Sequence, residues 1–297
     1  MALTDSQPTE DPGGLSVTDT RLIQAGDVVR ATDGTPRTGL LAWHLNPIVT
    51  GTSGMAYSVA PFAAITSRNG SGVEKVANDA ATSVATTAAP GSNSRIDVIW
   101  VRCRFPSYTD AGQTTPVFGV TQGTASASPA KPSIPAGALE LATATVPSTA
   151  TATNSGVVIT QTFRYTAAAG GTVVVRNAGE LSDWTPSAGA RAFQIDTGIT
   201  HTRRGAAWDA TPKIAQGSFI LTGSLPAGGN LKRGITFPEG LFTQVPHIHI
   251  TVGNGRITPS IDAITPPTAA GASLSFDNWS PGAVGSPPTV WWTAIGI

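Results

Sequence analysis

Charged side chains are scarce in this sequence. Asp, Glu, Lys and Arg make up 12% of its 297 residues, which is about half the usual share. The 18 basic and 18 acidic side chains cancel, so the formal net charge is zero. Proteins bind nucleic acid through a field of positive charge, and we therefore expect no nucleic-acid partner. The composition also excludes coiled coils and helical bundles, which need Glu, Lys, Arg and Leu at helical spacing.

Cysteine and long apolar runs are also lacking. The single cysteine, Cys103, cannot form an internal disulfide. Strand-like alternation places its side chain on the same face as Ile99 and Val101, which predicts a buried, unreactive thiol. No window reaches the ~18 consecutive apolar residues of a membrane helix, so we expect no membrane insertion. Residues 1–14 lack the basic and apolar stretches of a secretory signal peptide, which predicts synthesis in a cytoplasm.

Glycine, proline and short β-branched segments are abundant. The chain has 33 glycines and 23 prolines, and its 40% of hydrophobic residues argues against disorder. Short apolar segments are separated by turn residues, as at 33–34, 69–70 and 254–255, at intervals of about 8–15 residues, which is typical of β-sandwiches and barrels. The predicted strands are residues 27–31, 54–59, 96–105, 117–121, 156–165, 172–176, 192–196, 218–222, 245–252, 274–276 and 289–295. We therefore predict an all-β protein.

Two segments do not follow this strand pattern. Residues 135–144 begin with proline and contain Leu139 and Leu141, and they give the best helix signal of the chain, for two or three turns at most. Residues 78–90 are rich in alanine and threonine, which is compatible with a loop and with a weak strand.

The composition divides the chain into three blocks. Residues 1–150 form an N-terminal β domain that would anchor the protein, and residues 147–156 are a low-complexity stretch typical of a linker. Residues 151–212 are a β-hairpin connector with short strands. Residues 213–297 have the most regular alternation of strands and turns, and contain three of the seven tryptophans. This last block predicts an antiparallel β-sandwich.

Motifs for catalysis are missing from the sequence. There is no Gly-x-Ser-x-Gly elbow, phosphate-binding loop, dinucleotide fingerprint or His-Glu-x-x-His motif. Glycoside cleavage needs two carboxylates about 5–10 Å apart, and no local pair stands out. We therefore expect no enzymatic activity and no cofactor.

One pair of histidines has the spacing of metal ligands. His247 and His249 lie two residues apart on a predicted strand, so both imidazoles share a face while Ile248, Ile250 and Val252 face the core. Two nitrogens are too few for a closed metal site in a monomer. On a threefold axis, three copies would supply six nitrogens, an octahedral set suited to a transition metal. The alternative is a solvated or subunit-facing surface without metal.

Tryptophans are the other candidate binding groups. Trp291 and Trp292 are adjacent on a predicted strand, so one ring faces each side and at least one belongs to the core. Trp279 follows Asp277 and Asn278 in a predicted loop. An exposed ring beside these polar side chains would form a sugar-binding platform, because a sugar requires a flat apolar surface together with hydrogen-bonding groups. The alternative is a ring that closes the end of the sandwich.

The last block resembles the H-type lectin domain. The matching segments are QGSF at 216–219, GITFP at 234–238, FTQVPHIHI at 242–250 and VWWTAIG at 290–296. The resemblance implies a six-stranded antiparallel β-sandwich that trimerises and binds sugars between subunits. By position, the family's aromatic contact corresponds to Trp279, its histidine to Ser280 and its arginine to Ser260. Since two of these three contacts differ, the resemblance bears more on fold and assembly than on sugar chemistry.

The preceding residues are similar to phage tail proteins. SRIDVIWV at 94–101, GTASASP at 123–129 and IPAGALELA at 134–142 resemble the N-terminal domains of minor tail or baseplate proteins from phages of actinobacteria and other Gram-positive hosts. GARAFQIDTG at 189–198 and RGAAW at 204–208 resemble a β-hairpin module of tail fibres. These resemblances imply a virion protein located in the tail.

The residues and the resemblances together favour a structural protein of the phage tail that presents a lectin-like sandwich for host-surface recognition. The expected partners are further copies of the chain in a homotrimer, other tail or baseplate proteins, and a host cell-surface glycan. An alternative is a purely structural tail or capsid decoration protein without receptor binding. A polysaccharide-degrading tail enzyme is disfavoured by the missing pair of carboxylates.

Overall fold

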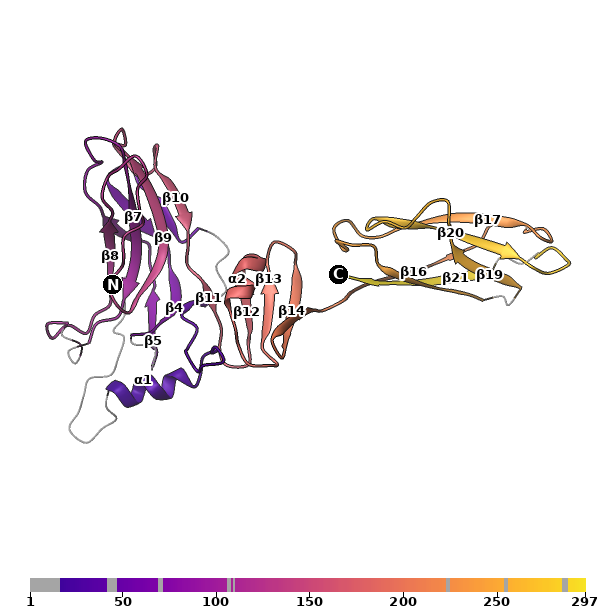
Figure 1. The fold of residues 1–297 in the computed structure, drawn as a ribbon, viewed down its shortest axis with the longest axis horizontal. Coiled ribbons are helices and arrows are strands. Elements are labelled where there is room, and N and C mark those ends of the chain that lie inside the picture. The colour runs from indigo at the N-terminus through magenta and orange to yellow at the C-terminus, as the bar shows by residue number, and fades with distance from the viewer. Residues whose placement is uncertain are drawn as a thin grey trace. The chain divides into compact units, whose positions relative to one another are not determined.

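The predicted all-β class is confirmed. The structure is a computed structural model that describes residues 17–41, 47–68, 72–105, 108, 110–222, 225–253, 256–284 and 288–297. Strands dominate these residues, and the helices among them are the short α1 (Val17–Ala25) and α2 (Ala178–Asp183) (Figure 1). The described residues form two compact units, of which the N-terminal one ends at Trp208 and the C-terminal one begins at Asp209.

The N-terminal unit contains four small sheets. Their strand orders are β11-β1-β4-β5, β10-β9-β7-β8, β2-β3-β6 and β12-β13-β14-β15. Most neighbouring strands are antiparallel, while β1 pairs with β11 and β12 pairs with β13 in parallel. The strands are β1 (Gly39–Leu41), β2 (Val49–Gly51), β3 (Ala56–Val59), β4 (Phe62–Thr66), β5 (Glu74–Asn78), β6 (Thr82–Ala85), β7 (Ser94–Arg102), β8 (Val117–Gln122), β9 (Ala138–Pro147), β10 (Val158–Gln161), β11 (Tyr165–Thr166), β12 (Thr172–Val175), β13 (Arg191–Gln194), β14 (Ile199–Arg204) and β15 (Ala207–Ala210).

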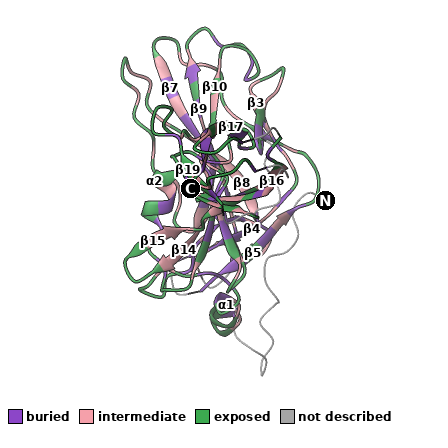
Figure 2. Cartoon of the chain, turned by 90° about the vertical axis from the view of Figure 1, so that its right-hand side faces the viewer, coloured by how far each residue is buried: buried purple, intermediate pink, exposed green. Residues whose placement is uncertain are grey.

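Buried residues lie mainly within the strands of this unit (Figure 2), and every residue of β7 is buried or half-buried. Ile99, Val101 and Cys103 are at most 2% exposed and belong to one core cluster, as their alternation predicts. A second cluster joins Val173 and Val175 of β12 to Ala25 at the end of α1. The segment from Val173 to Trp208 therefore belongs to the N-terminal unit through apolar contacts.

Three local expectations in this unit are wrong. Residues 135–144 contain no helix, because β9 pairs with β7 along most of its length and its alternation buries Leu139 and Leu141 on one side. Residues 27–31 form only isolated bridges at Val28 and Arg30. Residues 147–156 are not a free linker, because Thr153 is 1% exposed and its hydroxyl accepts a hydrogen bond from the Thr52 N–H at 2.8 Å.

Other local features of the sequence can now be placed. The alanine- and threonine-rich segment contains the strand β6. The turn at 33–34 is present, and Oδ1 of Asp33 accepts a hydrogen bond from the N–H of Thr35 at 2.9 Å. The predicted turns at 69–70 and 254–255, and residues 1–14, lie outside the described residues.

The C-terminal unit is a six-stranded antiparallel β-sandwich. Its sheets have the orders β16-β21-β18 and β17-β20-β19. Leu274 and Phe276 of one sheet and Val290 and Ala294 of the other are fully buried in a common core. The strands are β16 (Lys213–Ile220), β17 (Asn230–Thr236), β18 (His247–Val252), β19 (Ile257–Ile261), β20 (Gly271–Asn278) and β21 (Thr289–Gly296).

The two adjacent tryptophans of β21 lie on opposite sides of their sheet, as predicted. Trp292 packs against the core, with its ring centroid 5.8 Å from that of Phe237. A Cβ at Gly217 would lie 2.7 Å from the Trp292 ring, so only glycine leaves room for the indole on β16. Trp291 points outward and is 50% exposed.

Candidate functional site

The outer face of the β17-β20-β19 sheet is polar. The inward side chains of β20, such as Leu274 and Phe276, are fully buried, so Ser273, Ser275 and Asp277 lie on the outer side of the strand, where Ser275 is only 8% exposed. The strand register places Asp277 between Asn230 and Thr258, and places Ser275 between Lys232 and Ser260. These rows lie about 7 Å apart along the strands. We call this face, with Trp279, the polar strip.

Hydrogen bonds and an ion pair organise the polar strip. The amide of Asn230 donates to Oγ of Ser275 at 2.5 Å and to Oδ1 of Asp277 at 2.6 Å. Nζ of Lys232 pairs with the carboxylate of Asp262 at 2.9 Å. The Lys232 ammonium and the N–H of Ile264 lower the pKa of Asp262 below the ordinary value for aspartate. The charges of Lys232 and Asp262 therefore compensate each other, and Asp277 keeps an oxygen that is not bonded to Asn230.

Trp279 lies at one end of the polar strip. Its backbone N–H donates to the carbonyl oxygen of Arg256 at 3.3 Å, one pair beyond the last ladder pair of β19 and β20. The Trp279 side chain is 78% exposed. The ring therefore does not close the end of the sandwich, and it is accessible to a ligand. The outward side chains of this sheet form four rows across its strands, the first at Trp279 and the last at Asp262. Together the rows span about 20 Å along the strands.

Asn278, which precedes Trp279, has a structural role and not the sugar-binding role that its sequence position suggested. Asn278 is 1% exposed, and its amide donates to the carbonyl oxygens of Leu225, Pro226 and Gly282 at 2.9–3.1 Å. Its Oδ1 accepts hydrogen bonds from the N–H and hydroxyl of Ser280 at 3.0 and 2.8 Å. Asn278 thus fixes the turn that presents Trp279, and its polar atoms are occupied within the protein.

The structure brings Trp279 and Asp277 together at the surface, while the sequence did not identify the residues beside them. Asn230, Thr258 and Lys232 come from other strands, and only the register places them next to β20. One signal was present in the sequence: serine, serine and aspartate alternate with buried residues at positions 273, 275 and 277. Ser260 is exposed on β19 within the polar strip.

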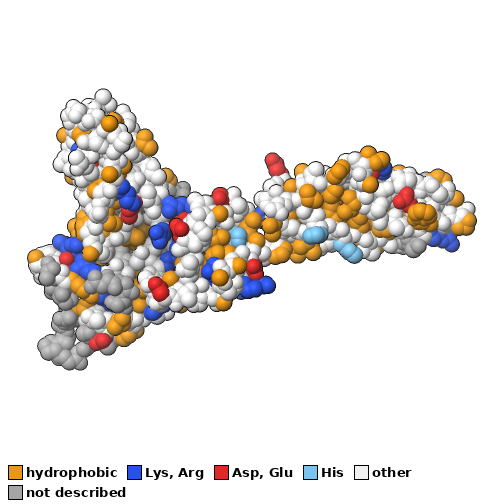
Figure 3. Space-filling view, in the orientation of Figure 1, with side chains coloured by type: hydrophobic (Ala, Val, Ile, Leu, Met, Phe, Trp, Pro, Cys, Tyr) orange, Lys and Arg blue, Asp and Glu red, His pale blue; other side chains and the backbone are white. Residues whose placement is uncertain are grey.

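The histidine pair lies on the other sheet of the sandwich. His247 and His249 are exposed on one face of β18, and Ile248, Ile250 and Val252 pack against the core, as predicted. In Figure 3, histidine atoms of this unit lie at the surface among hydrophobic and uncharged side chains. No group of three or more His, Cys, Asp or Glu side chains within the described residues could hold a metal ion. Within one chain the pair therefore offers two nitrogens, and a metal on these histidines stays a prediction that depends on assembly.

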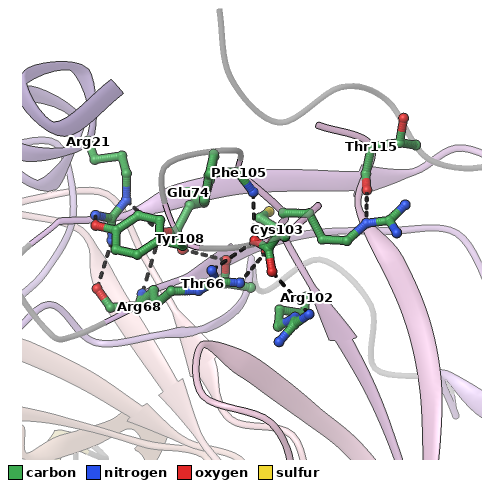
Figure 4. Close-up of polar contacts among 11 residues, drawn as sticks. Arg21, Thr66, Arg68, Glu74, Arg102, Cys103, Phe105, Tyr108 and Thr115 are labelled. Atoms are coloured by element: carbon green, nitrogen blue, oxygen red, sulfur yellow. Dashed lines mark hydrogen bonds and ion pairs between the residues drawn. The ribbon is translucent and has the colours of Figure 1, made fainter. Parts of the chain in front are cut away.

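The N-terminal unit contains a buried polar cluster beneath α1 (Figure 4). Arg21 is 1% exposed; its Nε donates to Oε1 of Glu74 at 2.6 Å, and its Nη2 donates to the Arg68 carbonyl oxygen at 2.8 Å. A third nitrogen donates to the Tyr108 hydroxyl. The Thr66 hydroxyl donates to Oε2 of Glu74 at 2.8 Å. The guanidinium and the carboxylate are thus largely satisfied by each other and by their neighbours.

The cluster continues from Arg68 to Asp110. Nη1 of Arg68 donates to Oδ2 of Asp110 at 2.8 Å, and Nη2 donates to the Cys103 carbonyl oxygen at 3.1 Å. The Phe105 N–H donates to the same carboxylate at 2.7 Å, and Arg102 pairs with it at 3.3 Å. Every charged group of this network has a protein partner, so we assign it to the stability of the unit rather than to ligand binding.

A groove of about 540 Å³ also opens on the N-terminal unit. Its walls include alanines of β4 and β5 together with Val28 and Leu41. The ionisable side chains that line it, Asp27 and Lys75, pair with each other at 3.5 Å. The groove lacks the convergent polar groups that would fix a ligand or an attacking water.

The C-terminal unit belongs to the class of six-stranded antiparallel sandwiches, with a polar outer face on one sheet and the histidine pair on the other. No family model, curated protein or solved structure matches this chain. Within the described residues, no helix is long and apolar enough to cross a membrane.

Proposed function

We propose that this chain is a structural protein of a phage tail, assembled with other tail or baseplate proteins after synthesis in the host cytoplasm. Its C-terminal sandwich contacts the host surface, and the polar strip binds a host cell-surface glycan. The proposal of a tail protein derives from the sequence resemblances. The proposal of a glycan ligand derives from one observation, the 78% exposed ring of Trp279 at the end of a strip of hydroxyl, amide and carboxylate groups.

The chemistry of the polar strip fits a saccharide. A sugar ring presents an apolar face that stacks on an indole and hydroxyl groups that bond to polar side chains. Asp277 supplies an acceptor oxygen for such hydroxyls, and Thr258 and Ser260 supply groups that both donate and accept. Asn230 holds the Asp277 carboxylate in place at 2.6 Å. The length of the strip, about 20 Å, accommodates several sugar units rather than one.

Binding of the full chain to envelope polysaccharides of Gram-positive and actinobacterial cells tests the glycan proposal. Calorimetric titration should show binding to at least one polysaccharide, and Trp279→Ala should weaken it at least tenfold. Asp277→Asn should weaken it less, because the amide keeps one acceptor oxygen. The matched control is Val245→Ala, which removes part of a 54% exposed apolar side chain of the same unit outside the strip and should leave binding unchanged.

A different result would redirect the proposal. If no polysaccharide binds, or if Trp279→Ala binds as tightly as the unmodified chain, the glycan site is refuted. Association of Trp279 with another tail or capsid protein would then favour the purely structural alternative. Release of sugar products from the polysaccharide would instead indicate an enzyme.

A further inference from the structure

A second groove opens on the N-terminal unit between three segments of its chain. Its volume is about 350 Å³, and it is lined by residues within 26–31, 169–171 and 184–191. Backbone hydrogen bonds hold these segments together: the Ala169 N–H donates to the Asp27 carbonyl oxygen at 2.8 Å, and the Thr32 N–H donates to the Thr185 carbonyl oxygen at 2.8 Å. The groove is therefore formed by the folded unit itself, and its size falls within the range of small-molecule sites, roughly 300–1,000 Å³.

This groove, which we call the arginine groove, has positive charge without negative charge. Arg30 and Arg191 line it and are exposed, and none of the residues that line it is Asp or Glu. Neither arginine pairs with a carboxylate in the part of the chain that the structure describes. The buried arginines described in this unit do have such partners, in the pairs Arg21–Glu74, Arg37–Glu180, Arg68–Asp110 and Arg95–Asp97. The arginine groove therefore contains two cations that the chain itself leaves uncompensated.

The two arginines differ in how firmly they are held. Nε of Arg30 donates to the Ala25 carbonyl oxygen at 3.0 Å, and its Nη1 donates to the Gly34 carbonyl oxygen at 3.4 Å. Arg191 begins β13, and its guanidinium has no hydrogen-bond partner among the described residues. A guanidinium presents its donors in one plane and binds two oxygens of a phosphate at once. Arg30 is thus fixed beside the groove, while all donors of the Arg191 guanidinium are available to a ligand.

Trp184 adds a buried donor at the wall of the arginine groove. Its side chain lines the groove but is only 3% exposed, because the ring packs against Trp208 at 5.4 Å between centroids and lies 5.1 Å from the Arg37 guanidinium. Within the described residues, its Nε1 is buried without an acceptor. Buried donors are almost always bonded to protein, ordered water or ligand, so this N–H calls for an oxygen that the described chain does not supply.

We propose that the arginine groove binds a small molecule that carries a phosphate group, with the phosphate oxygens bonded to Arg30 and Arg191. The indole N–H of Trp184 donates to the same group, directly or through one ordered water. A phosphate suits this arrangement better than a carboxylate does, because its terminal oxygens point in several directions and meet donors from separate segments. Val28 and Pro186 line the groove as well and offer apolar contacts to the rest of the molecule. The site is independent of the polar strip, which belongs to the other unit.

Titration of the full chain with inorganic phosphate and with glycerol 3-phosphate tests this site. The indole N–H signals are followed by nitrogen–proton correlation NMR at constant ionic strength, and the Trp184 signal is assigned by its loss in Trp184→Phe. Both phosphates should shift this signal saturably, and acetate should bind at least tenfold more weakly. Arg191→Ala should raise the dissociation constant for phosphate at least tenfold, and Arg191→Lys less, because lysine keeps the charge but not the planar donors. The matched control is Arg164→Ala, which removes an exposed arginine of the same unit outside the groove and should leave binding unchanged.

A further variant leaves both arginines in place. Ala188 is exposed within the groove, and Ala188→Glu supplies a carboxylate that competes for the guanidinium groups. This variant should abolish phosphate binding without changing the melting temperature. The absence of a saturable shift, or acetate binding as tight as that of phosphate, would overturn the proposal. Equal losses in Arg191→Ala and Arg164→Ala would overturn it as well, because they would show only general attraction of anions. Trp279→Ala should bind phosphate normally, so this proposal and that of the glycan site are refuted by separate results.

Discussion

Removal of Arg21 tests how the N-terminal unit is held together. Arg21 and Glu74 are each 1% exposed, and they pair at 2.6 Å. In Arg21→Ala, the Glu74 carboxylate keeps the Thr66 hydroxyl at 2.8 Å but loses its guanidinium. Breaking a buried ion pair in this way costs about 3–5 kcal/mol, because an uncompensated charge stays in the interior. For a unit of this size, each kcal/mol lowers the melting temperature by about 2–4 °C, so a decrease of about 6–20 °C is expected.

Differential scanning calorimetry measures this decrease with an internal reference. The chain has two compact units with separate cores, so we expect two transitions. Arg21→Ala should lower the transition of the N-terminal unit and leave that of the sandwich in place. The double variant with Arg21→Met and Glu74→Leu should lose less stability than Arg21→Ala, because it removes both charges.

A loss of less than about 1 kcal/mol for Arg21→Ala, which is the range of an exposed pair, would refute the role of the buried ion pair. A double variant that is less stable than Arg21→Ala would refute it as well. In that case the two aromatic contacts of the guanidinium, with ring centroids of Phe105 and Tyr108 at 5.8 and 5.1 Å, would matter more than the charge of Glu74.

Two further predictions concern the stability of the chain at low pH and the substitution of a glycine in the sandwich. Burial raises the pKa of Asp110, but the Phe105 N–H and the nearby guanidinium groups outweigh this and hold its net pKa below the ordinary value. The stabilisation by the Asp110 carboxylate is therefore complete above the unfolded pKa of about 3.9, and it is lost as the pH falls through the folded pKa. Urea unfolding between pH 7 and pH 2 should show this loss in the unmodified chain and not in its Asp110→Asn variant. In the sandwich, Gly217→Ala places a Cβ 2.7 Å from the Trp292 ring and should cost about 1–3 kcal/mol by thermal unfolding, whereas Gly234→Ala meets nothing within 4 Å and should be close to neutral.

Strands with a clear two-residue alternation were predictable from the sequence. β18 alternates apolar residues on one face, and β7 places Ile99 and Val101 in the core; the predicted ranges overlap both strands, and the burial of Cys103 and the common face of the histidine pair were predicted as well. The strand within residues 135–144 was not predictable, because proline and alanine with Leu139 and Leu141 fit a helix as well as a strand. The deciding contact is β7, about 40 residues away, whose ladder with β9 no local pattern reveals.

The candidate site was predictable only in part, for a similar reason. Asp277 and Trp279 are close in sequence, so both were recognised as candidates, but the sequence did not show that β20 extends to Asn278, directly before Trp279. Asn230 and Thr258 reach the same row only through the register of three strands. Asn278 shows the reverse case: its amide looked available beside Trp279, but alternation turns it inward, where three carbonyl groups accept its hydrogen bonds.

The placement of the few charged side chains bears on what the surface of this chain can recognise. Several of its few ionised side chains are buried in pairs, such as Arg21 with Glu74 and Arg95 with Asp97, whose carboxylate is 0% exposed. Fewer charges therefore reach the surface than a content of 12% suggests. Such a surface offers mainly indole, hydroxyl and amide groups to a partner, and its long-range attraction of a charged partner is weak. A neutral saccharide is recognised by these same groups at short range, which is why the proposed ligand class suits this chain better than a polyanion.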